Sequence, residues 1–160
     1  MTGVSLLQIP ALTYGWMSLF SEHAGNALLQ PIIDGSRSGS FPIRLCVPLF
    51  FSFLIPAIPF LAKKEEEIFR KGKDEWCGII WSSVIFGLSH CIMGIPLGAG
   101  FALIIPGLFF GYKYKRAFDN STSLTKSRAE DEAVMESTVY HTMHNTIALG
   151  IVLGFVIKDL

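Results

Sequence analysis

The chain has 160 residues, enough for one domain, and its 13 basic and 13 acidic side chains leave no net charge. This balance argues against nucleic acid as the main partner. Charged residues make up only 16% of the chain and apolar residues 51%, whereas a typical soluble domain carries about 25% charged residues. Low charge together with several long apolar runs indicates an all-α protein, a multi-pass transmembrane helical bundle.

Residues 1–44 form an N-terminal membrane-associated or spanning segment followed by a loop. Met1 to Phe20 is moderately apolar but is interrupted by Pro10 and Gly15, so a spanning helix and an interfacial segment both remain open. Asp34 to Ser40 consists of turn and loop residues. No basic region precedes the first apolar segment, so we do not expect a cleaved signal peptide.

Residues 45–160 are predicted to form the core of the protein, with four apolar helices and one more if the N-terminal segment spans. A hydrocarbon layer of about 30 Å needs roughly 20 apolar residues in a helix. Pro48, Pro56 and Pro59 should kink the first of these helices. The four apolar runs are Leu45 to Ala62, Trp76 to Ile95, Leu97 to Tyr112 and Ala133 to Ile157.

Two polar stretches between the helices, Lys63 to Glu75 and Ala117 to Glu132, are interpreted as loops rich in basic residues. The helical hairpin between them puts both on one side of the membrane, and the positive-inside rule makes that side cytoplasmic. Three glycine pairs have the spacing that lets membrane helices approach closely. They are Gly94 and Gly98, Gly107 and Gly111, and Gly150 and Gly154.

Acidic side chains follow directly on the first apolar run, at Glu65 and Glu66. An ionisable group at bilayer depth costs roughly 2.5–3.5 kcal/mol on insertion scales, so it usually has a partner and a function. On a helix, Glu66 and Arg70 are four residues apart and can pair. Glu65 is rotated by about 100° from Glu66 and is free to face a different neighbour. The alternative is a solvated run of charges just beyond a helix end.

Further polar side chains lie inside two later apolar helices. His90 shares a helix face with Phe86, and His141 shares one with Asn145. Taken alone, His90 could be a hydrogen-bonded core residue, and the second pair could be a polar helix start. Because lipid penalises all of these groups, the simplest interpretation is that they face one another and Glu65.

Such a cluster has the parts needed to hydrolyse a peptide bond without a covalent intermediate. A carboxylate or an imidazole can take a proton from a water that attacks a carbonyl group. A second histidine with an asparagine can donate hydrogen bonds to the oxyanion, typically worth about 3–4 kcal/mol. The chain contains no Gly-x-Ser-x-Gly or His-Glu-x-x-His motif, which argues against a serine hydrolase or a zincin.

These residues resemble the CAAX protease and bacteriocin-processing family, intramembrane endopeptidases akin to the type II prenyl-protein protease. Three family motifs stand in order, and the match extends over Leu45 to Leu160. Arg70 is followed by Lys71, where the family usually has glycine. The motifs are Glu-Glu-x-x-x-Arg at Glu65 to Arg70, Phe-x-x-x-His at Phe86 to His90 and His-x-x-x-Asn at His141 to Asn145.

The resemblance implies a role for each residue. Glu65 and His90 would activate the water, while His141 and Asn145 would form the oxyanion site. Glu66 and Arg70 would support this geometry, and Phe86 belongs to the second motif. No metal is favoured, although a rival mechanism has zinc held by the acid and both imidazoles, Glu65, His90 and His141.

The expected protein is an intramembrane endopeptidase of the cell membrane, with its active-site loops on the cytoplasmic side. Its partners would be membrane lipids and a peptide or protein substrate, and the resemblance leaves open whether that substrate carries a lipid. Two other functions remain open. One is a catalytically silent family member that acts as an immunity factor or scaffold. The other is a small transporter that uses the buried charges as a proton relay.

Overall fold

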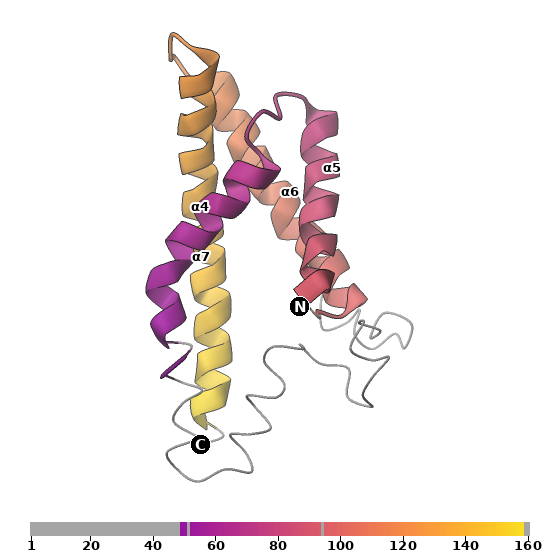
Figure 1. Ribbon diagram of the computed structural model, residues 1–160, viewed down its shortest axis with the longest axis vertical. Coiled ribbons are helices and arrows are strands. Elements are labelled where there is room, and N and C mark those ends of the chain that lie inside the picture. Colours follow the sequence, from indigo (N-terminus) through magenta and orange to yellow (C-terminus); the bar gives the residue numbers. More distant parts are fainter. Residues whose placement is uncertain (1–48, 51, 94, 159–160) are drawn as a thin grey trace.

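The computed structural model describes residues 49–50, 52–93 and 95–158 (Figure 1). Within these residues the chain is 87% helical and contains no strand, which confirms the all-α class. The predictions for the segment 1–44, and the start of the first apolar run, lie outside the described residues. The helical elements of the described residues are η3 (Ile55–Ala57), α4 (Ile58–Phe69), α5 (Trp76–Ser89), η4 (His90–Met93), α6 (Leu97–Asn120) and α7 (Lys126–Lys158).

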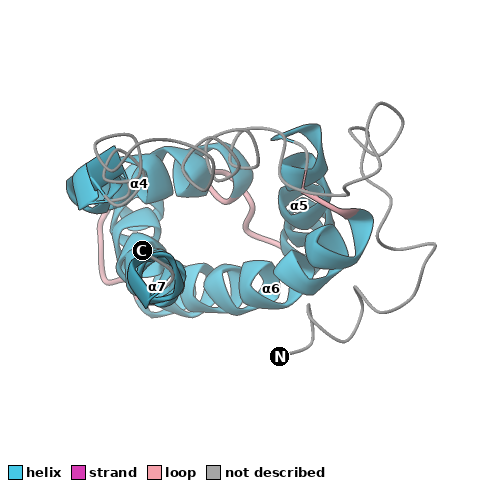
Figure 2. Ribbon diagram, turned by 90° about the horizontal axis from the view of Figure 1, so that it is seen from below, coloured by secondary structure: helices cyan, strands magenta, loops and turns pink. Residues whose placement is uncertain are grey.

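The four α-helices follow one another around the bundle in the order α4, α7, α6, α5 (Figure 2). The main contacts are those of α5 with α6, α6 with α7 and α7 with α4. The expected break in the first apolar run occurs at a short 3₁₀ turn, η3, with Pro56 in its first turn and Pro59 in the first turn of α4. Proline fits the start of a helix because its missing N–H has no partner there.

The predicted loops are wrong in their extent. Helix α4 continues through the charged residues as far as Phe69, α6 extends to Asn120 and α7 begins at Lys126. Lysine, glutamate and arginine are good helix formers, and opposite charges one turn apart support a helix. The change from apolar to charged residues therefore marks a change of surroundings and not the end of a helix. Three such pairs are Lys63 with Glu67, Lys115 with Asp119 and Arg128 with Glu132.

The two remaining turns, at residues 70–75 and 121–125, lie at the same end of the bundle (Figure 1). Two ion pairs join their surroundings. Lys71 Nζ lies 2.6 Å from Asp131 Oδ1, and Lys126 Nζ lies 2.7 Å from Asp74 Oδ2. The shared end is the arrangement that the predicted helical hairpin requires.

Glycines bring α5 and α6 into close contact. A Cβ atom added to Gly111 would lie 2.5 Å from Cγ2 of Ile79, so a larger residue there would push the helices apart. Gly107 stands one turn earlier on the same face of α6. By contrast, Cβ atoms at Gly150 and Gly154 would meet nothing within 4 Å among the described residues. Of the predicted glycine pairs, Gly107 and Gly111 lie at a helix contact. The pair of Gly94 with Gly98 cannot be compared, because Gly94 lies outside the described residues.

One described helix, α6, is long and apolar enough to cross a membrane, and Trp76–Ile92 is apolar but shorter. Within residues 49–50, 52–93 and 95–158, α6 is the single helix that is both long and apolar enough. The multi-pass arrangement therefore stays a prediction.

Candidate functional site

The end of α4 contributes a buried ion pair to the interior of the bundle. Glu66 and Arg70 are both fully buried, and Arg70 Nε lies 3.6 Å from Glu66 Oε2, as their spacing predicts. The guanidinium also donates a hydrogen bond of 2.9 Å to Ser82 Oγ on α5 and one of 2.8 Å to the backbone oxygen of Gly107 on α6. Arg70 thus links α4 to α5 and α6, and Gly107 has no side chain to block its approach.

Glu66 is the centre of this polar cluster. Its Oε1 lies 2.8 Å from Nδ1 of His141, and Ser137 Oγ donates to its Oε2 at 2.5 Å. Ser137 and His141 are both buried and stand one turn apart on α7. Because an ionised carboxylate only accepts hydrogen bonds, the Nδ1 atom of His141 carries a proton. Glu66 therefore fixes both the orientation and the protonated nitrogen of this imidazole.

The other nitrogen of His141 faces Glu65. His141 Nε2 lies 3.5 Å from Glu65 Oε2, longer than a good hydrogen bond. That carboxylate oxygen is buried and has no hydrogen-bond partner within the described chain. Both long side chains reach the same ring, although only Glu66 also contacts Ser137 and Arg70.

Aromatic rings enclose the imidazole of His141. The Phe110 ring stacks on it, with centroids 4.4 Å apart and planes inclined by 17°. The Phe86 ring meets it edge-on at 5.4 Å and lies 4.8 Å from the ring of His90. These rings hold the imidazole in place and keep its surroundings apolar, which strengthens the electrostatic contacts there.

The remaining two candidate residues stand further from Glu65. His90 Nδ1 lies 2.7 Å from the backbone oxygen of Phe86, so Nδ1 is the donor in this contact. Asn145 follows His141 by one turn on α7 and is half-buried. Among the described residues, the side chains of His90 and Asn145 make no polar contact with the side chains of Glu65 or His141. The structure brings His90 to the cluster only through the ring of Phe86.

The proposed zinc ligands are brought together only in part. Glu65 and His141 face each other, but His90 does not join them in a set of ligands. In the portion of the chain with assigned positions, no group of three or more His, Cys, Asp or Glu side chains could hold a metal ion. The donor set expected for catalytic zinc, three protein ligands with an open position, is therefore not assembled there.

Two residues of the cluster were missed by sequence reasoning. Phe110 carries no polar signal, and an aromatic residue in an apolar helix gives no hint of its neighbour. Ser137 could have been found, because it precedes His141 by four residues and shares its helix face. It is the residue that completes the hydrogen bonding of Glu66.

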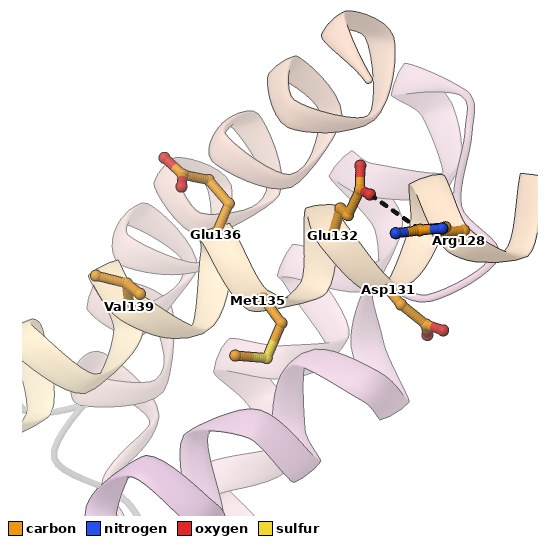
Figure 3. A pocket seen from close by; sticks show the side chains of 6 residues that line it. All are labelled: Arg128, Asp131, Glu132, Met135, Glu136 and Val139. Carbon is orange, nitrogen blue, oxygen red and sulfur yellow. Dashed lines mark ion pairs between the residues drawn. The ribbon is translucent and has the colours of Figure 1, made fainter. Parts of the chain in front are cut away.

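A separate hollow of about 530 Å³ lies along the exposed side of α7 (Figure 3). None of the candidate site residues lines it. Arg128 Nε lies 3.6 Å from Glu132 Oε1 there, and Asp131 is paired with Lys71. Its lining residues are Arg128, Asp131, Glu132, Met135, Glu136 and Val139.

The cluster as a whole offers a carboxylate, Glu65, beside an imidazole that a second carboxylate, Glu66, holds in one orientation. Such a pair can bind a water and take a proton from it. The resemblance to a protease family is carried by the three motifs alone. No protein-family model, no curated protein and no solved structure matches this chain.

Proposed function

We propose that this protein is an intramembrane endopeptidase that hydrolyses peptide bonds with a water activated by Glu65. The substrate is a peptide or protein that reaches the site from the membrane or from the cytoplasmic face. The bundle crosses the cell membrane several times, and the turns at residues 70–75 and 121–125 lie on the cytoplasmic side.

One observation carries this proposal. Glu65 Oε2 is buried without a hydrogen-bond partner, 3.5 Å from His141 Nε2. In the neutral form of the ring, with its proton on Nδ1 toward Glu66, Nε2 has a lone pair. In that form two acceptor atoms face each other, and a water that donates to both of them satisfies the pair. A buried acceptor without a donor is costly in a site that has no use for it.

The reaction follows from this placement. The water oxygen attacks the peptide carbonyl carbon while Glu65 accepts the water proton, and the carbonyl oxygen becomes an oxyanion. The Asn145 amide donates a hydrogen bond to that oxyanion. As the C–N bond breaks, Glu65 returns the proton to the leaving nitrogen.

The two imidazoles have different parts in this proposal. In the neutral ring, His141 accepts a hydrogen bond from the water, and it can donate to the oxyanion only when Nε2 is also protonated. His90, whose Nδ1 donates to the backbone oxygen of Phe86, is the second base for the water. Both assignments place His141 nearer to the reaction than His90.

Exposed apolar side chains support the membrane placement. On α5, Ile80, Trp81 and Ile85 are 50%, 62% and 55% exposed. Soluble monomers rarely expose contiguous apolar patches larger than a few hundred Å². Similar residues are exposed on the other helices, including Phe60 on α4, Phe109 on α6 and Ile147 on α7. Lipid is the environment that suits all of these faces.

The test compares two neighbouring acids on α4. The full chain in liposomes is incubated with a quenched-fluorescent peptide library, and products are identified by mass spectrometry. Glu65→Gln should lower the cleavage rate by at least about 100-fold, the usual contribution of a general base. Glu67→Gln should cleave like the wild type, because Glu67 is paired with Lys64 and does not contact the cluster.

Each outcome of this assay decides something. Cleavage by Glu65→Gln at the wild-type rate would overturn the role of Glu65. Cleavage abolished by a chelator and restored by zinc would favour the metal-dependent protease. A folded wild-type chain that cleaves no peptide would contradict the proposal and favour the silent immunity or scaffold protein.

A further inference from the structure

A hollow of about 310 Å³ lies between α6 and α7 and takes no part in the proposed chemistry. It lies near the charged end of α6, just beyond the apolar run that closes at Tyr112. In a membrane this is the level at which an apolar helix meets the lipid headgroups. Its lining residues are Lys113, Arg116, Ala117, Asn120, Glu136 and Tyr140.

Two cations of the hollow lack acidic partners. Most lysines and arginines in the described part of the chain form an ion pair with an aspartate or glutamate. Among the side chains placed by the structure, Lys73, Lys113 and Arg116 do not. Two of these three line this hollow.

Aromatic rings fix the position of one of these cations. Lys113 Nζ lies 3.9 Å from the centre of the Tyr140 ring and 5.4 Å from that of Phe109. A cation over an aromatic face is stabilised by the ring without being neutralised, so it can still bind an anion. The ammonium group of Lys113 is therefore held at the hollow by aromatic rings, with no ion pair among the described residues.

The hollow also contains a carboxylate. Glu136 lies one turn before Tyr140 on α7 and, among the described residues, forms no ion pair. Its neighbour Glu132 is engaged by Arg128 on the same helix (Figure 3). The hollow is thus lined by two cations and one acid that form no ion pair with one another.

We propose that this hollow binds the headgroup of a phospholipid that carries both a phosphodiester and a primary ammonium group. Lys113 and Arg116 bind the phosphate, and the Asn120 amide is a further donor. Glu136 binds the ammonium group. A headgroup with phosphate alone would leave the carboxylate close to a second negative charge, so Glu136 selects the zwitterion.

Basic hollows between membrane helices are common headgroup sites. This inference rests on the proposed membrane placement but not on the proposed cleavage. The bound headgroup would bridge α6 and α7 beside the candidate site, because Tyr140 directly precedes His141 and Lys113 follows Phe110 by one turn.

The experiment uses the full chain in detergent and three probes: dihexanoyl phosphatidylethanolamine, dihexanoyl phosphatidylglycerol and inorganic phosphate. Bound lipid is counted by native mass spectrometry, and affinity is taken from the shift in melting temperature. The wild type should bind the ethanolamine lipid most tightly. Lys113→Gln and Arg116→Gln should each weaken it by about fivefold. Glu136→Gln should bind the two lipids equally well, and Lys73→Gln should behave like the wild type.

Several results would overturn the proposal. Equal binding of the two lipids by the wild type would show that the hollow binds the phosphate without selecting the ammonium group. A shift in melting temperature with inorganic phosphate as large as that with the lipids would show that the ligand is a free anion. Unchanged binding by Lys113→Gln and Arg116→Gln would place the lipid elsewhere. A chain that stays monodisperse without detergent would remove the membrane placement itself, whereas Glu65→Gln should bind lipid normally whether or not the wild type cleaves peptides.

Discussion

Two ion pairs of this protein differ in their surroundings: one is buried along α4, and the other is exposed and joins the turn at residues 70–75 to α7. Arg70 and Glu66 are 3.6 Å apart and fully buried, whereas Lys71 and Asp131 are 2.6 Å apart with side chains 41% and 61% exposed. The shorter contact is the weaker one, because water solvates the exposed charges almost as well when they separate. Burial and the number of hydrogen bonds, and not the distance alone, decide what each pair contributes.

Breaking the buried pair should have the largest effect. Arg70→Met leaves the Glu66 carboxylate buried without its cation and removes the donors to Ser82 and Gly107. Removing one partner of a buried ion pair typically costs about 3–5 kcal/mol. We expect a large drop in the free energy of unfolding, measured by denaturant titration in detergent.

The matched control is Arg128→Met, which breaks an exposed pair with Glu132 on a single helix. It should unfold at nearly the same denaturant concentration as the wild type. An equal loss of unfolding free energy in Arg70→Met and Arg128→Met would show that burial does not decide what an ion pair contributes.

Removing a single buried hydrogen bond should have an intermediate effect. Ser137→Ala takes away the donor to Glu66 Oε2 and should destabilise the chain by about 1–3 kcal/mol, the cost of an unsatisfied buried acceptor. Because Glu66 then holds His141 less firmly, kcat for peptide cleavage should fall while KM changes little. Ser137→Thr, which keeps the hydroxyl group, should restore part of both.

An exposed serine gives the control for this variant. Ser123 Oγ donates to Glu132 Oε1 at 2.6 Å on the surface. Ser123→Ala should leave the melting temperature and the cleavage rate unchanged. A larger effect of Ser123→Ala than of Ser137→Ala would contradict the importance of the buried cluster.

The exposed link between the turns should show the smallest effect, and it should depend on pH. The hydrogen bond from Lys126 lowers the pKa of Asp74, and the same contact raises the pKa of Lys126. A carboxyl pKa that is lower in the folded state stabilises the protein above its unfolded value and loses this effect as pH falls through the folded value. For the raised lysine pKa, the effect is lost only as pH rises above the usual lysine range.

Asp74→Asn should therefore melt slightly below the wild type at neutral pH, and the difference should disappear in acid below the usual carboxyl range. High salt should also reduce it, because salt screens exposed charges. Melting curves across pH and salt concentration measure both trends. A difference that persists in strong acid would show that the link does not depend on the Asp74 charge.

The sequence predicted the parts of this structure that depend on helical spacing. The four-residue interval placed Glu66 beside Arg70. Of the polar residues expected to meet, Glu65 and His141 do so. The side chains of His90 and Asn145 do not contact them within the described residues. Spacing could not show which backbone atoms accept hydrogen bonds. The contact between Arg70 and the Gly107 oxygen depends on how closely α6 approaches, a tertiary property.

The helix ends were mispredicted for a related reason. A run such as Lys63 to Glu67 looks like the end of an apolar segment, but its own side chains pair along a helix. The position of His90 was also beyond the sequence. Its spacing to Phe86 fixed their contact, while the distance from Glu65 depends on how α5 lies against α4.

Helix α7 is continuous from Lys126 to Lys158. It contributes Asp131 to the exposed ion pair and His141 to the buried cluster around Glu66. Asp131 at the turns and His141 at the cluster lie on the same rod, separated by ~15 Å at the usual rise per residue. Because a helix is stiff along its axis, the position of α7 at the turn and the position of His141 are linked. The exposed ion pair of Lys71 with Asp131, although weak in energy, can therefore influence the alignment of His141 with Glu65.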